Sequence, residues 1–214
     1  MKLYGYYLSL ASFRVRIAMA LKGLEREDVS LDLLKGDQFD TAFQKVNPQM
    51  VVPALIDDDG HVITQSIAIL EYLDETYRDP PLLPDDSLGR ARVRQIAQIA
   101  IADSHPLIVP RVRSYLTKQL NHSEAEMTAW VRHWLTVANE AIEALLAAGP
   151  RGTYAHGDQV TLADLCIVPQ VAGSRRFECD LSGQTHMTRV FDACMALDGF
   201  QAALPKNQPD FVPS

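Results

Sequence analysis

The sequence predicts an α/β domain followed by an all-helical domain. Up to residue 79, short strand-like apolar runs alternate with helix-like patterns, whereas the apolar residues further on recur with helical spacing. The stretch at 80–86 contains three prolines, a composition typical of a linker. We therefore expect an α/β domain at 1–79, a linker at 80–86 and a helical domain at 87–214.

The first part has its elements in the order βαβαββα. The expected elements are a strand at 2–7, a helix at 13–21, a strand at 27–31, a short helix carrying Phe39, Phe43 and Val46, strand-like runs at 51–55 and 63–66, and a helix that begins at Ser66. Gly23 ends the first helix, as a C-terminal glycine commonly does. This order of elements is that of a thioredoxin-like domain.

The runs at 51–55 and 63–66 flank a cluster of turn-forming residues at 57–60 and are expected to form a hairpin. Pro53 cannot donate a hydrogen bond to a sheet, and a cis peptide bond costs proline only about 0.5–1 kcal/mol. A cis Val52-Pro53 bond would turn the backbone of Val52 outward. Its amide and carbonyl would then be available to an extended peptide ligand.

Ser66 is expected to be the N-cap of the helix that follows the hairpin. A helix N-terminus attracts anions, and a carboxylate suits the unpaired amides there. The hairpin and the helix start together indicate a receptor for a small peptide with a carboxylate at one end. The alternative is a proline turn followed by an ordinary capped helix.

The second part is predicted to be helical throughout. Its expected helices lie at 88–120, with breaks at Pro106 and Pro110, at 124–148, and after a capping box formed by Thr161 and Asp164. Between 124 and 148 the apolar residues recur at i, i+3, i+4 and i+7, which is typical of a helix packed on a core.

The charge and the cysteines narrow the possible functions. The formal net charge is −7 and the longest basic run is Arg175-Arg176, which argues against a nucleic-acid-binding surface. The sequence has no apolar run long enough for a membrane span and no basic-then-apolar start, so we expect a cytoplasmic protein. The three cysteines lack CxxC spacing and suit a reducing compartment. The histidines lack the spacing of a zinc site, so we expect no metal.

Three ordered segments closely resemble the glutathione-binding half of the glutathione transferases. They are Asn-Pro-Gln at 47–49, Val-Pro-Ala-Leu at 52–55 and Gln-Ser-Ile-Ala-Ile at 65–69. Segments similar to the zeta class, which includes maleylacetoacetate and maleylpyruvate isomerases, lie at 14–18, 47–49, 103–106 and 175–177. The resemblance covers nearly the whole chain. It implies the glutathione transferase architecture, glutathione as the cosubstrate, and a homodimer with each site close to the subunit interface.

The resemblance also implies roles for individual residues. The nucleophile is a glutathione thiolate, and Ser9, with Ser12 as the fallback, would donate a hydrogen bond to it at the start of the first helix. The residues implied in binding glutathione are Gln49, Val52, Pro53, Gln65 and Ser66, with Asp103 and His105 near the neighbouring subunit's site. Each serine has the alternative role of a simple N-cap. Asp103 and His105 have the alternative of contacting each other across a helix turn.

The substrate pocket departs from the zeta pattern. Arg111 and Arg176 stand where the resemblance predicts arginines that bind carboxylates, but Leu8 replaces another one. The second hydroxyl and the cysteine of the family's serine motif are replaced by Leu10 and Ala11, and the paired asparagines after His-Pro by Ile108 and Val109. The acceptor pocket is therefore expected to be more apolar.

The resemblance implies an enzyme of one of two kinds. The first is a glutathione-dependent cis-trans isomerase of maleyl-type 2-oxo acids, which acts through reversible addition of the glutathione thiolate. The second is a zeta-like transferase that conjugates other small electrophiles. A glutathione-binding or ligand-binding protein without turnover is the alternative from a different class.

Overall fold

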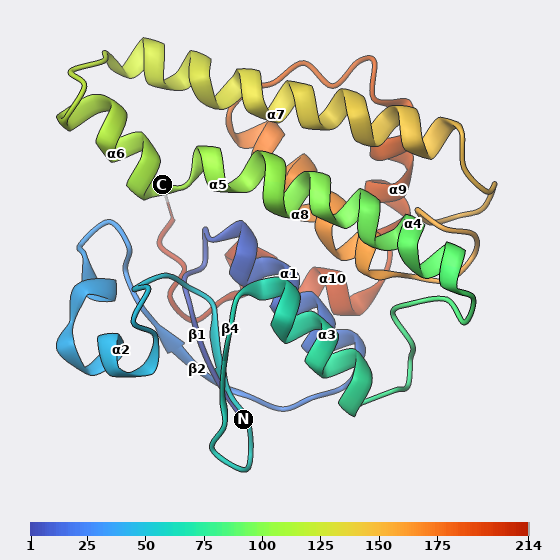
Figure 1. The fold of residues 1–214 in the computed structure, drawn as a ribbon, viewed down its shortest axis with the longest axis horizontal. Coiled ribbons are helices and arrows are strands. Elements are labelled where there is room, and N and C mark those ends of the chain that lie inside the picture. The colour runs from blue at the N-terminus through green and yellow to red at the C-terminus, as the bar shows by residue number, and fades with distance from the viewer. Residues whose placement is uncertain (214) are drawn as a thin grey trace. The chain divides into compact units, whose positions relative to one another are not determined.

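The computed structural model describes residues 1–213 and divides the chain into two compact units. The first unit combines Met1–Pro81 with the described residues from Met195 to residue 213, and the second comprises Leu82–Cys194. Figure 1 shows the sheet in the first unit and the long helices in the second. The α/β part and the helical part that the sequence predicts are thus both present.

The first unit contains a four-stranded mixed sheet in the order β2-β1-β3-β4. The strands are β1 (Lys2–Gly5), β2 (Glu27–Ser30), β3 (Ala54–Ile56) and β4 (Val62–Thr64). β1 pairs in parallel with β2 and antiparallel with β3, and β3 pairs antiparallel with β4 across the expected turn. With the helices between the strands, the predicted order βαβαββα is confirmed.

The two faces of the sheet carry different apolar side chains because successive residues of a strand point to opposite faces. Leu3 is paired with Leu55, and both are buried. The next residue, Tyr4, instead stacks its ring on Phe43 of α2 (Thr41–Val46), with 5.4 Å between ring centroids. The helices α1 (Leu10–Leu21) and α3 (Ser66–Thr76) pack against each other, as Figure 1 shows.

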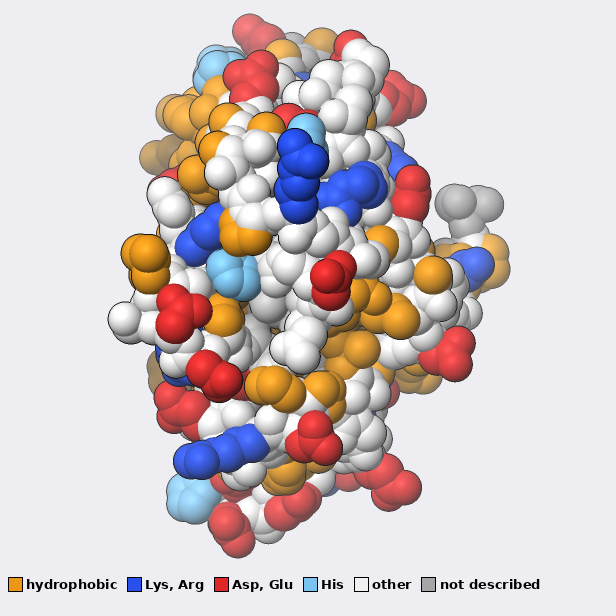
Figure 2. Space-filling view, turned by 90° about the vertical axis from the view of Figure 1, so that its right-hand side faces the viewer, with side chains coloured by type: hydrophobic (Ala, Val, Ile, Leu, Met, Phe, Trp, Pro, Cys, Tyr) orange, Lys and Arg blue, Asp and Glu red, His pale blue; other side chains and the backbone are white. Residues whose placement is uncertain are grey.

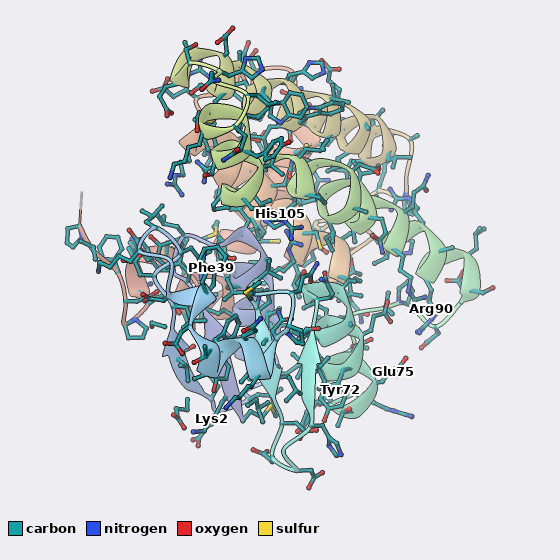
Figure 3. All side chains as sticks on the ribbon, turned by 60° about the vertical axis from the view of Figure 1, so that its left-hand side comes forward. Lys2, Phe39, Tyr72, Glu75, Arg90 and His105 are labelled. Atoms are coloured by element: carbon teal, nitrogen blue, oxygen red, sulfur yellow. The ribbon has the colours of Figure 1, made fainter. Side chains whose placement is uncertain are left out.

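Two helix predictions differ from the structure. The first helix begins at Leu10 rather than at residue 13, because Ser9 caps it. Phe39 was expected on a helix with Phe43, but it ends the short 3₁₀ turn η1 (Asp37–Phe39) and is 64% exposed. Asp40 separates the two elements by capping α2, so that Phe43 is buried whereas Phe39, labelled in Figure 3, is not.

The hairpin turn is organised by one buried carboxylate. Asp57 accepts hydrogen bonds from the backbone amides of Asp59 and His61, from His61 Nδ1 at 3.0 Å and from the Tyr72 hydroxyl at 2.8 Å. Tyr72 projects from α3 (Figure 3). Burial alone would raise the pKa of Asp57, but these donors lower it to about 2. The turn is thereby tied to the helix whose N-terminus carries Gln65 and Ser66.

The hairpin also brings Asp57, Asp59 and His61 together, with their ligand-type atoms within 4.8 Å of one another. Both oxygens of Asp57 already accept hydrogen bonds from the turn and from α3. The cluster is therefore accounted for by the architecture of the turn itself.

The C-terminal end of the chain belongs to the first unit, which corrects the predicted helical domain at 87–214. The short helix α10 (Asp198–Ala202) packs on α1, and the 3₁₀ turn η3 (Pro205–Asn207) follows it. A Cβ atom at Gly199 would lie only 2.9 Å from Leu21 Cδ2. The last residues thus return to the sheet domain through close packing that has no signature in local periodicity.

The second unit is built from helices. They are α4 (Ser87–Gln98), the π-helix η2 (Ile99–Ser104), α5 (His105–Ile108), α6 (Pro110–Lys118), α7 (Glu124–Ala147), α8 (Leu162–Arg176) and α9 (Thr185–Met195), whose last residue falls in the first unit. The break expected near the prolines lies at Val109, whose backbone is extended between α5 and α6. Pro110 opens α6, where its missing amide hydrogen is not needed.

The helix α8 forms the centre of the second unit and begins at the predicted capping box. Asp164 accepts hydrogen bonds from the amide of Thr161 at 2.7 Å and from the amide of Ala155 at 2.8 Å. Burial raises the pKa of Asp164 to about 6, although these hydrogen bonds act in the opposite direction. The capping box is confirmed.

The surface carries charges of both signs. On the face shown in Figure 2, acidic and basic side chains are interspersed with apolar ones. Among the helices of residues 1–213, none combines the length and the apolar character that crossing a membrane requires.

Candidate active site

Ser9 lies at the N-terminus of α1, which begins directly after the loop at residues 6–9. Its hydroxyl oxygen accepts a hydrogen bond from the amide of Ser12 at 3.2 Å, and its own amide donates to the carbonyl of Tyr6 at 2.9 Å. The side chain is half-buried, not sealed in the core. Because the Ser9 oxygen accepts a hydrogen bond from the helix, the hydroxyl proton remains available to donate to an anion. An anion at this position would also lie in the positive potential of the helix N-terminus.

Ser12 lies in a different environment. Its side chain is 0% exposed and faces Gly5 of β1, where an added Cβ would lie 3.4 Å from its hydroxyl oxygen. Within residues 1–213 this oxygen has no hydrogen-bond partner. Burial under β1 argues against Ser12 as a thiolate donor and favours Ser9.

Leu8 is part of an apolar cluster. It packs against the buried group formed by Tyr6, Phe43, Val52 and Ala54. Leu8 itself is only half-buried. The leucine therefore fits its surroundings in the first unit.

Val52 and Pro53 have the predicted backbone geometry. The Val52-Pro53 peptide bond is cis. Val52 precedes β3 and lies outside the paired register of the sheet, which begins at Ala54. Its amide and carbonyl are therefore not used by the ladder, as a peptide-binding edge requires.

The start of α3 differs in one respect from the prediction. The N-cap is Gln65, not Ser66, and its φ of 70° places it in the left-handed region, which is unusual for a residue other than glycine. Its side-chain amide donates to Gln49 Oε1 at 2.6 Å. The two glutamines expected to bind one ligand are thus in direct contact. A non-glycine residue held in this conformation is a common feature of ligand sites.

Ser66 is the first residue of α3 and is 5% exposed. Its hydroxyl oxygen accepts a hydrogen bond from Arg14 Nη1 at 3.1 Å, and the Arg14 side chain is itself buried. A buried cation therefore lies directly behind the hydroxyl at the helix start. The hydroxyl proton of Ser66 is free to point to a carboxylate, whose charge the guanidinium would complement.

Sequence reasoning did not find Arg14 or Arg16 as site residues. Both belong to α1, and both are buried. Arg16 donates to the carbonyls of Tyr6 at 3.3 Å and Tyr7 at 3.1 Å. Burial, and to a smaller extent the positive charge of Arg26, lower the pKa of Arg16 to about 10. The guanidinium is therefore charged at neutral pH. The signal in the sequence that could have indicated them was the presence of two arginines in an otherwise mostly apolar helix.

Asp103 and His105 lie where η2 meets α5 in the second unit (Figure 3 labels His105). Asp103 is exposed and His105 is half-buried. The residue between them, Ser104, is buried and accepts from Gln170 Nε2 at 3.4 Å, and the same amide group donates to Asn139 at 3.0 Å. This polar network joins the π-helix to α7 and α8. Single π-helical turns are frequent at functional sites.

The arginines predicted to bind substrate belong to two helices of the second unit. Arg111 is exposed on α6, and Arg176 is exposed at the end of α8. A third arginine, Arg113, was not predicted. Its guanidinium carbon lies 5.5 Å from the centre of the Phe177 ring, and that of Arg176 lies 6.0 Å from the same ring.

Arg113 is half-buried. Its Nε atom is buried without a hydrogen-bond partner among residues 1–213. Burial, and then the positive charge of Arg176, lower its pKa, and the charge of Glu124 partly offsets both effects. Two cations on one phenylalanine ring therefore form a local positive site that suits a carboxylate.

The first unit thus joins a thioredoxin-like sheet, a cis-proline edge and two helix N-termini that suit a thiolate and a carboxylate, and a helical unit follows. This combination is that of a glutathione-binding transferase. Residues 1–75 match the N-terminal domain of glutathione S-transferases, and residues 112–198 match the C-terminal domain.

Similar proteins include the maleylpyruvate isomerase of a Ralstonia species, which is 45% identical over 98% of this chain and 99% of its own length. A holo structure of a bacterial zeta-class maleylpyruvate isomerase has a TM-score of 0.96 at 45% identity, covering 99% of this chain and 100% of that one. The maleylacetoacetate isomerase of Methylobacterium extorquens, solved with malonate and glutathione, has a TM-score of 0.96 at 40% identity, with 100% of both chains covered. The chain belongs to the zeta class of the glutathione S-transferase family.

Proposed function

We propose that this protein is a glutathione-dependent cis-trans isomerase of maleyl-type 2-oxo acids such as maleylpyruvate or maleylacetoacetate. The observation that carries the proposal is the pair of helix starts in the first unit: the Ser9 hydroxyl at α1 and the Ser66 hydroxyl, backed by Arg14, at α3. The names of the similar proteins support the same activity.

Glutathione fits the polar groups that the first unit leaves available. The backbone of Val52 would pair with the cysteinyl part of the peptide, and Gln49 and Gln65 would bond its polar groups. The γ-glutamyl carboxylate would accept from Ser66 and from the first amides of α3, with Arg14 behind them. Each group is of the type that this part of the peptide requires.

Bound glutathione supplies a thiolate that adds reversibly to the cis double bond of the acid and leaves after the bond has rotated. Ser9 holds that sulfur as an anion by donating its hydroxyl proton in a hydrogen bond, and the N-terminus of α1 adds positive potential. Arg111 and Arg176 bind the carboxylates of the acid and stabilise negative charge on its oxo oxygen. Arg113 adds to the positive charge beside Arg176.

A second function is favoured by one observation. Leu8 belongs to the apolar cluster of Tyr6, Phe43, Val52 and Ala54, so the thiolate end of the site lacks an arginine there. A less charged electrophile would be accommodated beside it. The second candidate is therefore a zeta-like transferase that conjugates small apolar electrophiles. If no electrophile is turned over, the remaining candidate is a protein that binds glutathione without catalysis.

The same proposal includes the assembly. We infer a cytoplasmic homodimer, in which Asp103 and His105 lie near the glutathione of the neighbouring subunit. The exposure of Asp103 at the surface of η2 supports this placement. Sedimentation of the purified protein, with and without Asp103→Arg, tests it: the variant is expected to weaken the dimer or the binding of glutathione.

The decisive experiment follows the loss of the cis-enol absorbance of maleylpyruvate and maleylacetoacetate with and without glutathione. Turnover that requires glutathione supports the isomerase. If glutathione binds by calorimetry but neither acid turns over, the isomerase proposal is wrong. Conjugation of an apolar electrophile such as a chlorodinitrobenzene would then identify the transferase. Inactivity on every electrophile would instead indicate a glutathione-binding protein without turnover.

A further inference from the structure

The loop that carries Ser9 is held from behind by the C-terminal end of the chain. The amide of Tyr7 donates to Asp210 Oδ2 at 2.9 Å, although the two residues are 203 positions apart. The Tyr7 ring also meets Phe211 edge-on, with 5.7 Å between centroids. Two contacts of different chemistry therefore fix the same residue of the loop.

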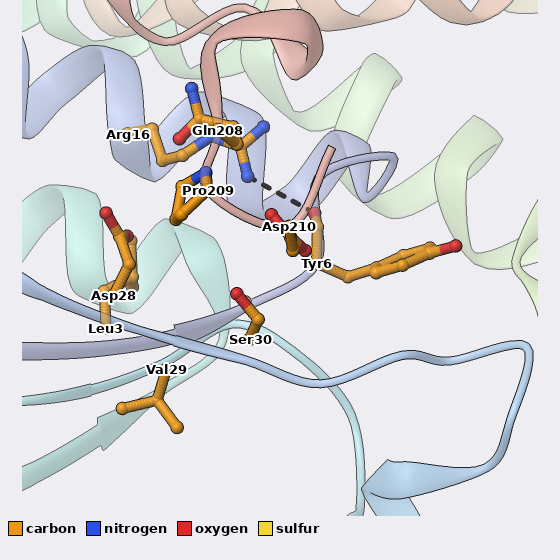
Figure 4. A pocket seen from close by; sticks show the side chains of 10 residues that line it. Leu3, Tyr6, Arg16, Asp28, Val29, Ser30, Gln208, Pro209 and Asp210 are labelled. Carbon is orange, nitrogen blue, oxygen red and sulfur yellow. Dashed lines mark hydrogen bonds between the residues drawn. The ribbon is translucent and has the colours of Figure 1, made fainter. Parts of the chain in front are cut away.

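Arg16, a buried residue of α1, connects the same two segments. It donates to the carbonyl of Tyr6 at 3.3 Å, to the carbonyl of Tyr7 at 3.1 Å and to the carbonyl of Ala203 at 3.3 Å. Figure 4 shows its guanidinium beside Asp210 and Gln208, with the bond to Tyr6 dashed. The side chains of Arg16, Gln208 and Asp210 are among those that line a pocket between the C-terminal segment and the sheet.

The hydrogen bonds of Arg16 also bear on the position of Ser9. The carbonyl of Tyr6, which Arg16 holds, also accepts the amide hydrogen of Ser9 at 2.9 Å. Both peptide groups that precede Leu8 are thereby fixed, which sets the direction in which the chain enters α1. A small displacement of the loop would move the Ser9 hydroxyl relative to a bound sulfur, and hydrogen bonds weaken steeply with misalignment.

We propose that the C-terminal segment, residues 203–211, positions the Ser9 loop for thiolate stabilisation, with Asp210 and Arg16 as the positioning residues. The inference rests on the role proposed for Ser9 and adds a contribution from the opposite end of the chain. Asp210 acts through the Tyr7 peptide and touches neither glutathione nor the electrophile.

The test measures the pKa of the bound glutathione thiol from the ultraviolet absorbance of its thiolate across pH. Asp210→Ala is expected to raise that pKa and to lower kcat about five- to tenfold, which is less than the full effect of losing one charge-assisted hydrogen bond, because Asp210 acts on Ser9 only through the Tyr7 peptide. Affinity for glutathione is expected to stay near that of the wild type, because Gln49, Gln65 and Ser66 are untouched. Asp210→Asn keeps an acceptor for the Tyr7 amide and is expected to restore most of the activity.

Asp28→Ala is the matched control. Asp28 lines the same pocket, but its carboxylate bonds to Arg26 at 2.9 Å and not to the loop. Its removal changes the local charge by the same amount and is expected to leave the thiol pKa unchanged. If Asp210→Ala is poorly folded in thermal unfolding, Phe211→Ala replaces it, with a smaller shift in the same direction.

Two results would overturn the inference. The first is that Asp210→Ala keeps the thiol pKa and the kcat of the wild type, although Ser9→Ala loses most of its turnover. The other is an equal loss of glutathione affinity in the Ala and Asn variants, which indicates a general structural role. A normal thiol pKa in Ser9→Ala would instead refute the proposed role of Ser9 itself, so the two failures are distinguishable.

Discussion

The guanidinium of Arg14 donates a hydrogen bond to the hydroxyl of Ser66 over 3.1 Å, and both side chains are buried. The pair joins α1 to the first residue of α3. A positive charge and a hydroxyl are therefore fixed together at a helix N-terminus, where an anion gains from the charge, the helix dipole and the free amides at once.

This relationship predicts that Ser66 recognises the γ-glutamyl carboxylate. Ser66→Ala is expected to weaken glutathione binding about ten- to a hundredfold, because a hydrogen bond to a charged group is lost. Calorimetry with glutathione and with an analogue that lacks this carboxylate provides the measurement. The variant is expected to discriminate less between the two ligands than the wild type does, because Arg14 and the first amides of α3 remain. Thr76→Ala, at the other end of α3, is the control. Undiminished discrimination in Ser66→Ala would show that the carboxylate binds elsewhere.

Ser9 and Ser12 are expected to respond in opposite ways to the same substitution. Ser9→Ala removes the proposed thiolate donor, so kcat at neutral pH falls and the pKa of the bound thiol rises. Ser12→Ala removes a buried hydroxyl that has no partner within residues 1–213, and the protein is expected to become slightly more stable, by up to about 1 kcal/mol, with turnover retained. Steady-state kinetics and denaturant unfolding separate the two. A loss of turnover in Ser12→Ala alone would reverse the assignment.

The hydrogen bonds to Asp57 predict a specific response to acid. Its pKa is lowered to about 2 in the folded protein, against an ordinary value near 4. A carboxyl group with a depressed folded pKa contributes stability above its unfolded pKa and loses it as the pH falls through the folded one. The contribution of Asp57 is therefore complete above about pH 4 and disappears toward pH 2. Tyr72→Phe removes one donor, which raises the pKa of Asp57.

Urea unfolding of the wild type and of Tyr72→Phe between pH 7 and pH 3 measures this effect. The stability difference between the two proteins is expected to be largest at neutral pH and to shrink as Asp57 is protonated. A difference that does not depend on pH would mean that the Tyr72 hydroxyl acts without the charge of Asp57. Tyr115→Phe, at an exposed position on α6, serves as the control.

The buried network around Gln170 is expected to hold the second unit together. Gln170→Leu leaves Ser104 and the side-chain carbonyl of Asn139 without their donor, and unsatisfied buried groups cost about 1–3 kcal/mol each. The free energy of unfolding is therefore expected to fall by about 2–4 kcal/mol. Gln95→Leu, at an exposed position on α4, is expected to change it little. Equal stability of the two variants would show that the network is replaced by water or repacking.

Local patterns were sufficient for the hairpin, its turn residues and the capping box at Thr161, because each depends on residues within a few positions of one another. The burial of Arg14 and Arg16 was not predictable in this way. Their partners lie 52 and up to 187 positions away, and no periodicity within α1 indicates them. Ser12 illustrates the same limit, since its sequence neighbours give no sign that β1 covers it. The roles of Ser9, Arg111 and Arg176 remain predictions to be tested by substitution.

The membership of both chain ends in the first unit bears on how the protein is made. A ribosome releases the sheet and α1 early, but Ala203 and Asp210 are synthesised much later. These two residues accept hydrogen bonds from Arg16 and from the Tyr7 amide. Arg16 and Ala203 are 187 positions apart, and Tyr7 and Asp210 are 203 apart. At about 5–20 residues per second, roughly 10–40 seconds therefore separate the two events. During that interval the nascent domain carries an arginine whose final acceptor does not yet exist. The catalytic half is therefore completed only after the helical half has been translated.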